Sequence, residues 1–306
     1  MKDYRMLRGF VFLVCITLLF TCTVYSQRDF DTVQIRSQKL SDAVSMLTGS
    51  GGNIGVSSGE DGVFIIDDQF APLTEKIKKA VADIARSNTP TRFVINTHWH
   101  GDHTGGNENM GKDGAVIIAH ENVRKRMSVE HFNDFFKRTT SPSPKAALPI
   151  VTFTQDVTLH LNSDDVYVFH VDSAHTDGDA IIHFTKANVV HMGDVFFWGS
   201  YPFIDISSGG SVNGMVAAVD KVLPMVNDET KIIPGHGNLA GKTELKTYRD
   251  MLAAIRDKMT ALIKEGKSLE QIKAAKPTAA FDERWGKGFM SPDSFVELLF
   301  ADLSRK

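Results

Sequence analysis

Three histidines and an aspartate follow one short apolar segment and have the residue types of a metal site. The segment 92–96, RFVIN, has strand composition, and THWHGDH (97–103) comes directly after it. In an extended loop His98 and His100 point the same way, because side chains alternate with period two. The adjacent Asp102 and His103 point elsewhere and can serve a second metal about 3.5–4 Å away. Imidazole and carboxylate are the ligands that zinc takes where thiolate is absent.

Further candidate ligands come after three later strand-like segments. His175 stands in DSAHTDGD, Asp194 in HMGD after an apolar VVH, and His236 in PGHG after KIIP. Taken singly, each is as readily explained as a surface or capping residue. Beside the HxHxDH motif, a ligand role is the better interpretation, because each stands among small residues at the end of a strand, as a site at the rim of stacked sheets requires.

Hydrophobic periodicity predicts two similar halves made of strands followed by helices. Hairpin strands are expected between 33 and 67, then a helix over 72–86 and a strand over 92–96. The remaining expected elements are strands at 115–119, 157–161, 166–171, 180–184, 189–191 and 231–233, helices at 121–136, 211–226 and 250–264, a mobile loop at 141–149, and a last helix capped by Ser291 with Pro292 in its first turn. This order indicates an α/β fold with two sheets face to face and helices outside.

The sequence resembles the metallo-β-lactamase superfamily in four features: THWHGDHTGGN, the later histidine, the GD after an apolar strand, and PGHG. The resemblance extends from about Val33 to Gly237 and implies a four-layer αββα sandwich with two zinc ions at one edge. The ligands that it implies are His98, His100 and His175 for one zinc; Asp102, His103 and His236 for the other; and Asp194, either bridging both ions or lying against the second.

The mechanism expected from the resemblance is attack of a zinc-bound hydroxide on a carbonyl, since zinc lowers the pKa of bound water to about 7. Asp102 is the expected catalytic residue, orienting the nucleophile and passing its proton to the leaving group. Asp67, at the end of a FIID strand, is either an acceptor for the N–H of a ligand imidazole or an ordinary turn residue.

The first 26 residues have the pattern of a secretory signal peptide. Three basic residues precede an apolar run over 9–20, and Val24 and Ser26 suit a cut before Gln27. The alternatives are an uncleaved anchor, for which the run is short of the roughly 20 residues that span a bilayer, and a lipid-anchored Cys22. We expect cleavage, no stable membrane insertion afterwards, and a periplasmic or secreted protein with one hydrolase domain over 27–306, including C-terminal helices.

The composition limits the kinds of ligand and partner that we expect for this protein. Both cysteines, Cys15 and Cys22, lie in the leader, which leaves no thiolate for the exported chain. The net charge of -3, from 34 basic and 37 acidic residues, gives no electrostatic reason to expect nucleic acid. A small-molecule substrate is expected instead.

Three functions compete for this site. The first is β-lactamase-type hydrolysis of a cyclic amide, against which Asp194 and Phe197 count: in the zinc β-lactamases that this chain resembles, one subclass has a zinc-bound cysteine and a substrate-anchoring lysine at these positions. The second is a glyoxalase II-like hydroxyacylglutathione hydrolase or another thioester or lactone hydrolase, which shares the bridging carboxylate. The third, a zinc-binding structural or sensor protein, is disfavoured by the complete ligand set.

Aromatic residues near the expected ligands have two interpretations. They either pack in the core or form an apolar wall for substrate. They are Trp99, Phe196, Phe197, Trp198, Tyr201 and Phe203.

Overall fold

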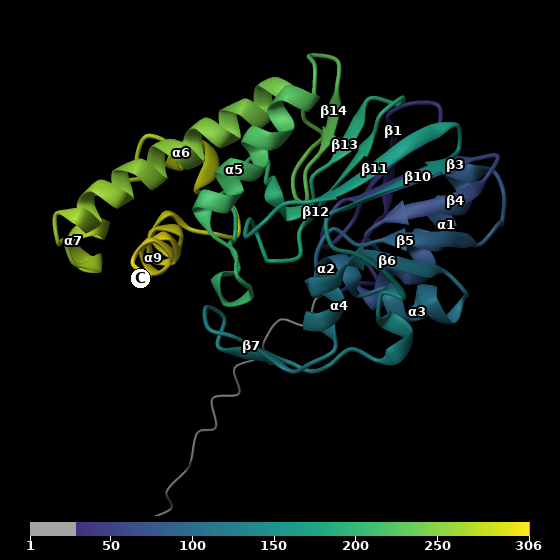
Figure 1. Ribbon diagram of the computed structural model, residues 1–306, viewed down its shortest axis with the longest axis horizontal. Helices are drawn as coiled ribbons and strands as arrows, with labels where there is room; N and C mark the ends of the chain where they lie inside the picture. Colours follow the sequence, from purple (N-terminus) through teal and green to yellow (C-terminus); the bar gives the residue numbers. More distant parts are fainter. Residues whose placement is uncertain (1–28, 306) are drawn as a thin grey trace, which may run out of the picture.

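The computed structural model describes residues 29–305 (Figure 1). The expected leader, its cut site and Cys22 lie outside the described residues. Among the residues described, no helix combines the length and apolar character that a bilayer crossing requires.

The first sheet has seven strands in the order β1-β2-β3-β4-β5-β6-β9. Their bounds are β1 (Arg36–Lys39), β2 (Val44–Thr48), β3 (Ile54–Gly59), β4 (Gly62–Ile66), β5 (Thr91–Ile95), β6 (Val116–His120) and β9 (Val151–Phe153). Strands β1 to β4 form an antiparallel meander, whereas β4, β5, β6 and β9 run parallel. The carboxyl ends of these parallel strands therefore lie along one edge.

The second sheet has five strands in the order β10-β11-β12-β13-β14. They are β10 (Asp156–Leu161), β11 (Asp164–His170), β12 (Ala180–Phe184), β13 (Val189–His191) and β14 (Lys231–Ile233). The first four pair antiparallel and the last pair is parallel. The backbone N–H of Ala180, at the start of β12, donates to the carbonyl of Thr97, which follows β5, at 2.8 Å. This bond joins the two sheets at the edge where the expected ligands are found.

Side chains alternate along the strands of the first sheet, so each face of this sheet contributes to a separate hydrophobic core. On β4, Phe64 and Ile66 face the second sheet, whereas Val63 and Ile65 face the helices α1 (Thr74–Ala85) and α3 (Asn107–Lys112). This period-two pattern is what a strand buried on both faces requires.

Helices cover the outer face of the second sheet in the same way. A core on this face joins the sheet to α5 (Val212–Val222), α6 (Lys242–Lys264) and α9 (Pro292–Leu303). Figure 1 shows these helices on one side of the stacked sheets and α1 and α3 on the other. The four-layer αββα sandwich predicted from the sequence is confirmed.

The remaining helices are short. They are α2 (Gly101–Thr104), α4 (Glu121–Met127), α7 (Leu269–Ala274), α8 (Asp282–Trp285) and the single-turn helices η1 (Ala71–Leu73), η2 (Lys145–Ala147), η3 (Gly193–Val195), η4 (Ile206–Ser208) and η5 (Leu223–Met225). Before α9, the side chain of Ser291 accepts from the backbone N–H of Ser294, as the sequence predicted for its cap.

The helix predicted over 121–136 is wrong in its second half. Helix α4 ends at Met127, and β7 (His131–Asn133) and β8 (Arg138–Thr140) form a hairpin instead. The side chain of Asn133 accepts from the backbone N–H groups of Phe135 and Phe136 and so closes a turn. Asparagine favours such local bonds over a helix interior, and the apolar spacing that resembled a helix belongs to the tip of this hairpin.

Candidate metal centre

Four segments, each following a strand, bring the candidate ligands to one edge of the sandwich. His98 and His100 follow β5, His175 follows β11, Asp194 lies in η3 after β13, and His236 follows β14. Asp102 and His103 were expected in an extended loop. That expectation is wrong, because both residues lie in the single turn of α2. The backbone N–H groups of His103 and Thr104 donate to the carbonyl of His100 and close that turn.

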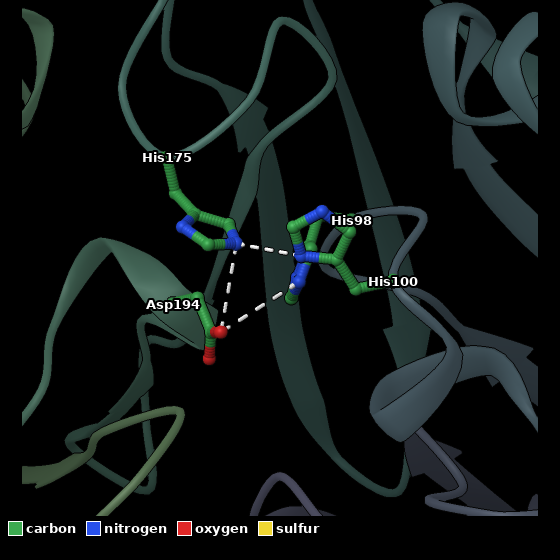
Figure 2. Close-up of side chains that lie close together, drawn as sticks. All are labelled: His98, His100, His175 and Asp194. Atoms are coloured by element: carbon green, nitrogen blue, oxygen red, sulfur yellow. Dashed lines mark hydrogen bonds and ion pairs between the residues drawn. The ribbon is translucent and has the colours of Figure 1, made fainter. Parts of the chain in front are cut away.

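The first donor group consists of His98, His100, His175 and Asp194, which offer ligand atoms within 4.8 Å of one another. Figure 2 shows the three rings and the carboxylate converging. His175 Nε2 lies 2.9 Å from His100 Nδ1, and Asp194 Oδ2 lies 3.5 Å from His175 Nε2 and 3.8 Å from His98 Nε2. The extended-chain argument that placed His98 and His100 together therefore led to the correct pairing.

The second donor group consists of Asp102, His103 and His236. His236 Nε2 lies 3.4 Å from His103 Nε2 and 3.3 Å from Asp102 Oδ2. Asp194 reaches this group with its other oxygen, since Oδ1 lies 3.0 Å from His103 Nε2 and 3.4 Å from His236 Nε2. Asp194 thus faces both groups at once, with one oxygen toward each.

The donor atoms fit a divalent cation better than they fit one another. Among the described residues, His98 Nε2 is buried without a hydrogen-bond partner, and a buried polar atom without a partner is costly. The facing nitrogens of His100 and His175 cannot both carry a proton at 2.9 Å. Imidazoles with a bridging carboxylate and no thiolate suit zinc.

In three of these rings the far nitrogen is held by a carboxylate or a carbonyl oxygen. His103 Nδ1 lies 2.7 Å from Asp67 Oδ2, His100 Nε2 lies 2.9 Å from Asp205 Oδ2, and His175 Nδ1 lies 2.8 Å from the carbonyl of Phe203. Such contacts fix which nitrogen is free to ligate a metal. The interpretation of Asp67 as an acceptor for a ligand imidazole is confirmed.

Two histidines of the first donor group, His98 and His175, are neutral. Burial lowers the pKa of His175 to about 4, although Asp194 opposes this, and burial together with the neighbouring His103 holds the pKa of His98 well below its usual value. Both rings therefore present an unprotonated nitrogen at neutral pH.

The second donor group holds protons instead. Burial disfavours the charge on His103 and His236, but the surrounding carboxylates, led by Asp194, raise the pKa of His236 to about 9 and that of His103 well above its usual value. Burial alone would also raise the pKa of Asp102, but the charge on His103 and the bond from His236 outweigh it, so that this pKa is lowered. Asp102 is a carboxylate at neutral pH.

Asp205 is the residue that the sequence analysis missed. Its side chain accepts from the N–H of Ser208 and caps η4, and a D-x-x-S sequence indicates no more than such a cap. Nothing in the local sequence links it to His100, which is 105 residues away.

Comparisons with known proteins identify the family of this chain. The family model of the metallo-beta-lactamase superfamily matches residues 47–274, and the chain belongs to this superfamily. A curated relative, metallo-beta-lactamase type 2 from Bacteroides fragilis, is 24% identical over 247 residues, which cover 76% of this chain and 91% of that one.

Two solved structures have the same fold at lower sequence identity. A metallo-beta-lactamase from Pontibacter korlensis matches with a TM-score of 0.58 and 17% identity, over 72% of this chain and 99% of that one. A double mutant of the sec-alkyl sulfatase PisA1 matches with a TM-score of 0.64 and 16% identity, over 89% of this chain and 50% of that one. The fold thus carries more than one activity, and the protein is a hydrolase of this superfamily with a His/Asp cluster of metal-binding type.

Proposed function

We propose that this protein is an exported hydrolase that uses two zinc ions to open a cyclic amide of the β-lactam type. The observation that carries the proposal is the position of Asp194, whose two oxygens face two separate donor groups. One carboxylate shared by two clusters of imidazole nitrogens is an arrangement suited to a pair of ions. The curated relative named as a metallo-beta-lactamase supports the choice of substrate.

Zinc, when bound, supplies an acidified water and polarises a carbonyl oxygen. Side chains of the protein position the ion and transfer the proton. His98, His100 and His175 present ring nitrogens from one side, and their outer contacts keep these rings in place. Asp102, whose side chain is 28% exposed, is the carboxylate through which a proton can pass between a nucleophilic water and a leaving group, because its lowered pKa keeps it ionised.

A thioester or lactone is the second candidate substrate, and one observation favours it. Phe197 is buried and its ring stacks on that of His236, with centroids 5.1 Å apart. In the resemblance noted above, a lysine at this position anchors the carboxylate of a β-lactam. An apolar ring here offers no such charge, so a neutral acyl group next to His236 is the chemistry that it accommodates.

Export is proposed from the leader pattern, with processing before Gln27. The expected test is N-terminal sequencing of protein taken from the periplasm and the medium. We also propose that the substrate is a small molecule and that the protein has no nucleic-acid partner.

The activity is tested by hydrolysis of a chromogenic cephalosporin with zinc-loaded protein beginning at Gln27. We expect turnover that chelation by EDTA abolishes and zinc restores, and that Asp102→Ala removes. Asp83→Asn, which changes an exposed carboxylate on α1, is the matched control and should keep full activity. No turnover with two zinc ions confirmed by metal analysis would contradict the β-lactam proposal, and S-lactoylglutathione and lactones would then distinguish the second candidate.

A further inference from the structure

A cluster of phenylalanine rings borders the first donor group. Phe203 lies against two of its histidines, with ring centroids 6.1 Å from His100 and 6.0 Å from His175. On its other side Phe203 meets the tip of the β7–β8 hairpin, at 5.6 Å from Phe135 and 4.7 Å from Phe136. The apolar surface is therefore continuous with the donor group.

A fourth ring comes from the C-terminal part of the chain. Phe289 precedes α9 and lies 5.8 Å from Phe136. Residue 289 is outside the stretch that the family model matches, which ends at 274. Three distant segments of the sequence thus contribute to one cluster, which we call the phenylalanine collar: Phe135, Phe136, Phe203 and Phe289.

The outer rings of the collar are open to solvent. Phe136 is 43% exposed and Phe289 is 75% exposed, whereas Phe203 is 8% exposed at the base. Exposed rings that gather beside a polar site indicate a surface that binds something apolar, in contrast to single exposed side chains. Phe132, on the same hairpin and 49% exposed, lies outside the collar's ring contacts.

The hairpin tip is held in position by the chain. The side chain of Asn133 accepts from the N–H groups of Phe135 and Phe136 and donates to Asp205 Oδ1 at 3.2 Å. Asp205 in turn accepts from His100. The two charged residues of the turn, Asp134 and Lys137, lie 3.7 Å apart and offset each other, so the tip presents rings without a net charge.

We propose that the phenylalanine collar is a specificity subsite for a ring-sized apolar group of the substrate, carried next to the carbonyl that reacts. This inference rests on the proposed function, since it places the reacting carbonyl at the first donor group. It names the class of substrate that this site prefers: an acyl compound with an aromatic or similarly bulky apolar side group. Pockets usually fix such groups by apolar contact and leave orientation to a few polar atoms.

The test is the binding of two zinc-directed ligands that differ by one ring, measured by calorimetry on protein whose zinc content has been determined. Phenylacetohydroxamate is expected to bind about tenfold more tightly than acetohydroxamate. Phe136→Ala and Phe289→Ala should each reduce this preference about threefold to tenfold, while acetohydroxamate binding stays unchanged. Phe132→Ala is the matched control and should keep the preference, because it removes an equally exposed ring outside the collar.

The outcomes separate this inference from the proposed function. Equal affinity for the two hydroxamates, or an equal loss from Phe132→Ala, would overturn the collar even if cephalosporin is hydrolysed. A preference that Phe136→Ala and Phe289→Ala remove would support the collar even if cephalosporin is not hydrolysed. A protein that takes up no zinc would bind neither ligand, and both proposals would then fail together.

Discussion

The ring of His100 is held from behind by Asp205, whose Oδ2 lies 2.9 Å from its Nε2. The opposite nitrogen, Nδ1, is thereby left facing His175 in the first donor group. Both side chains of the pair are largely buried, at 15% and 1% exposure, and bonds from Ser207 and Ser208 also hold the carboxylate. Burial alone would raise the pKa of Asp205, but the hydrogen bonds from His100, Ser207 and Ser208 outweigh this and lower it.

The first prediction concerns this pair. Asp205→Asn keeps the size of the side chain but removes its charge, so His100 loses both its orientation and part of its basicity. Zinc affinity of the first donor group should fall about 10- to 100-fold, as measured by competition with a chromophoric chelator. Asp134→Asn removes an exposed carboxylate from the nearby hairpin and should leave the affinity unchanged. Equal zinc affinity in Asp205→Asn and the parent protein would show that Asp205 only caps η4.

The second prediction compares a buried carboxylate with an exposed one. Asp67 is fully buried and accepts from His103, from the hydroxyl of Thr97 and from the backbone N–H of Thr97. Asp67→Asn should lower the free energy of unfolding of the metal-free protein by about 2–3 kcal/mol, because a buried charged group loses its partner. Asp113→Asn, whose partner Lys78 is at the surface, should cost less than about 1 kcal/mol. Urea unfolding of both variants measures the difference, and similar losses would contradict the role given to Asp67.

Strands β12, β13 and β14 were predicted with the bounds that the structure has, because each is a short apolar run with an aspartate, a glycine or a proline within two residues of one end. The site residues were predictable for a related reason. Each candidate ligand follows a strand, and strand ends in a sandwich meet at one edge, so residue type and position together indicate the cluster.

Contacts between distant segments could not be predicted in this way. Asp205 contacts His100 only after η4 has been folded against the first donor group. The collar joins Phe136 to Phe289 across more than 150 residues of sequence, and its hairpin was mistaken for the end of a helix. Local periodicity carries no information about which loops face each other.

The third prediction tests the close approach of backbone to a ligand ring. A Cβ on Gly52 would overlap the ring of His103, and His103 cannot move aside because it is buried and bonded to Asp67. Gly52→Ala should therefore displace His103 and reduce bound zinc from two ions toward one per chain, as measured by metal analysis after dialysis. Gly101→Ala is the control, since nothing lies within 4 Å of its added Cβ. Two firmly held zinc ions in Gly52→Ala would contradict the assignment of His103 to the second donor group.

The fourth prediction rests on the proposed pair of zinc ions and is that the two ions differ in the number of protons that their binding releases. His236, with its pKa raised to about 9, is protonated at neutral pH and must lose that proton before it can ligate a metal. Each proton that zinc displaces from the second donor group should therefore weaken the zinc affinity by about tenfold for every pH unit below 9. His175, with its pKa lowered to about 4, and His98, with its pKa well below the usual value, are already neutral, so neither should release a proton when the first donor group takes up zinc between pH 6 and 8.

Calorimetric titrations with zinc in two buffers of different ionisation enthalpy, at pH 6.5 and at pH 8, measure these protons directly. The tighter ion should release few protons at either pH, whereas the weaker one should release at least one at pH 6.5. His236→Ala should abolish the weaker, pH-dependent step and keep the tighter one. Equal proton release by both ions would contradict the separation into a neutral and a protonated donor group, and with it the view that the carboxylates of Asp102 and Asp194 hold protons on the second group until a metal replaces them.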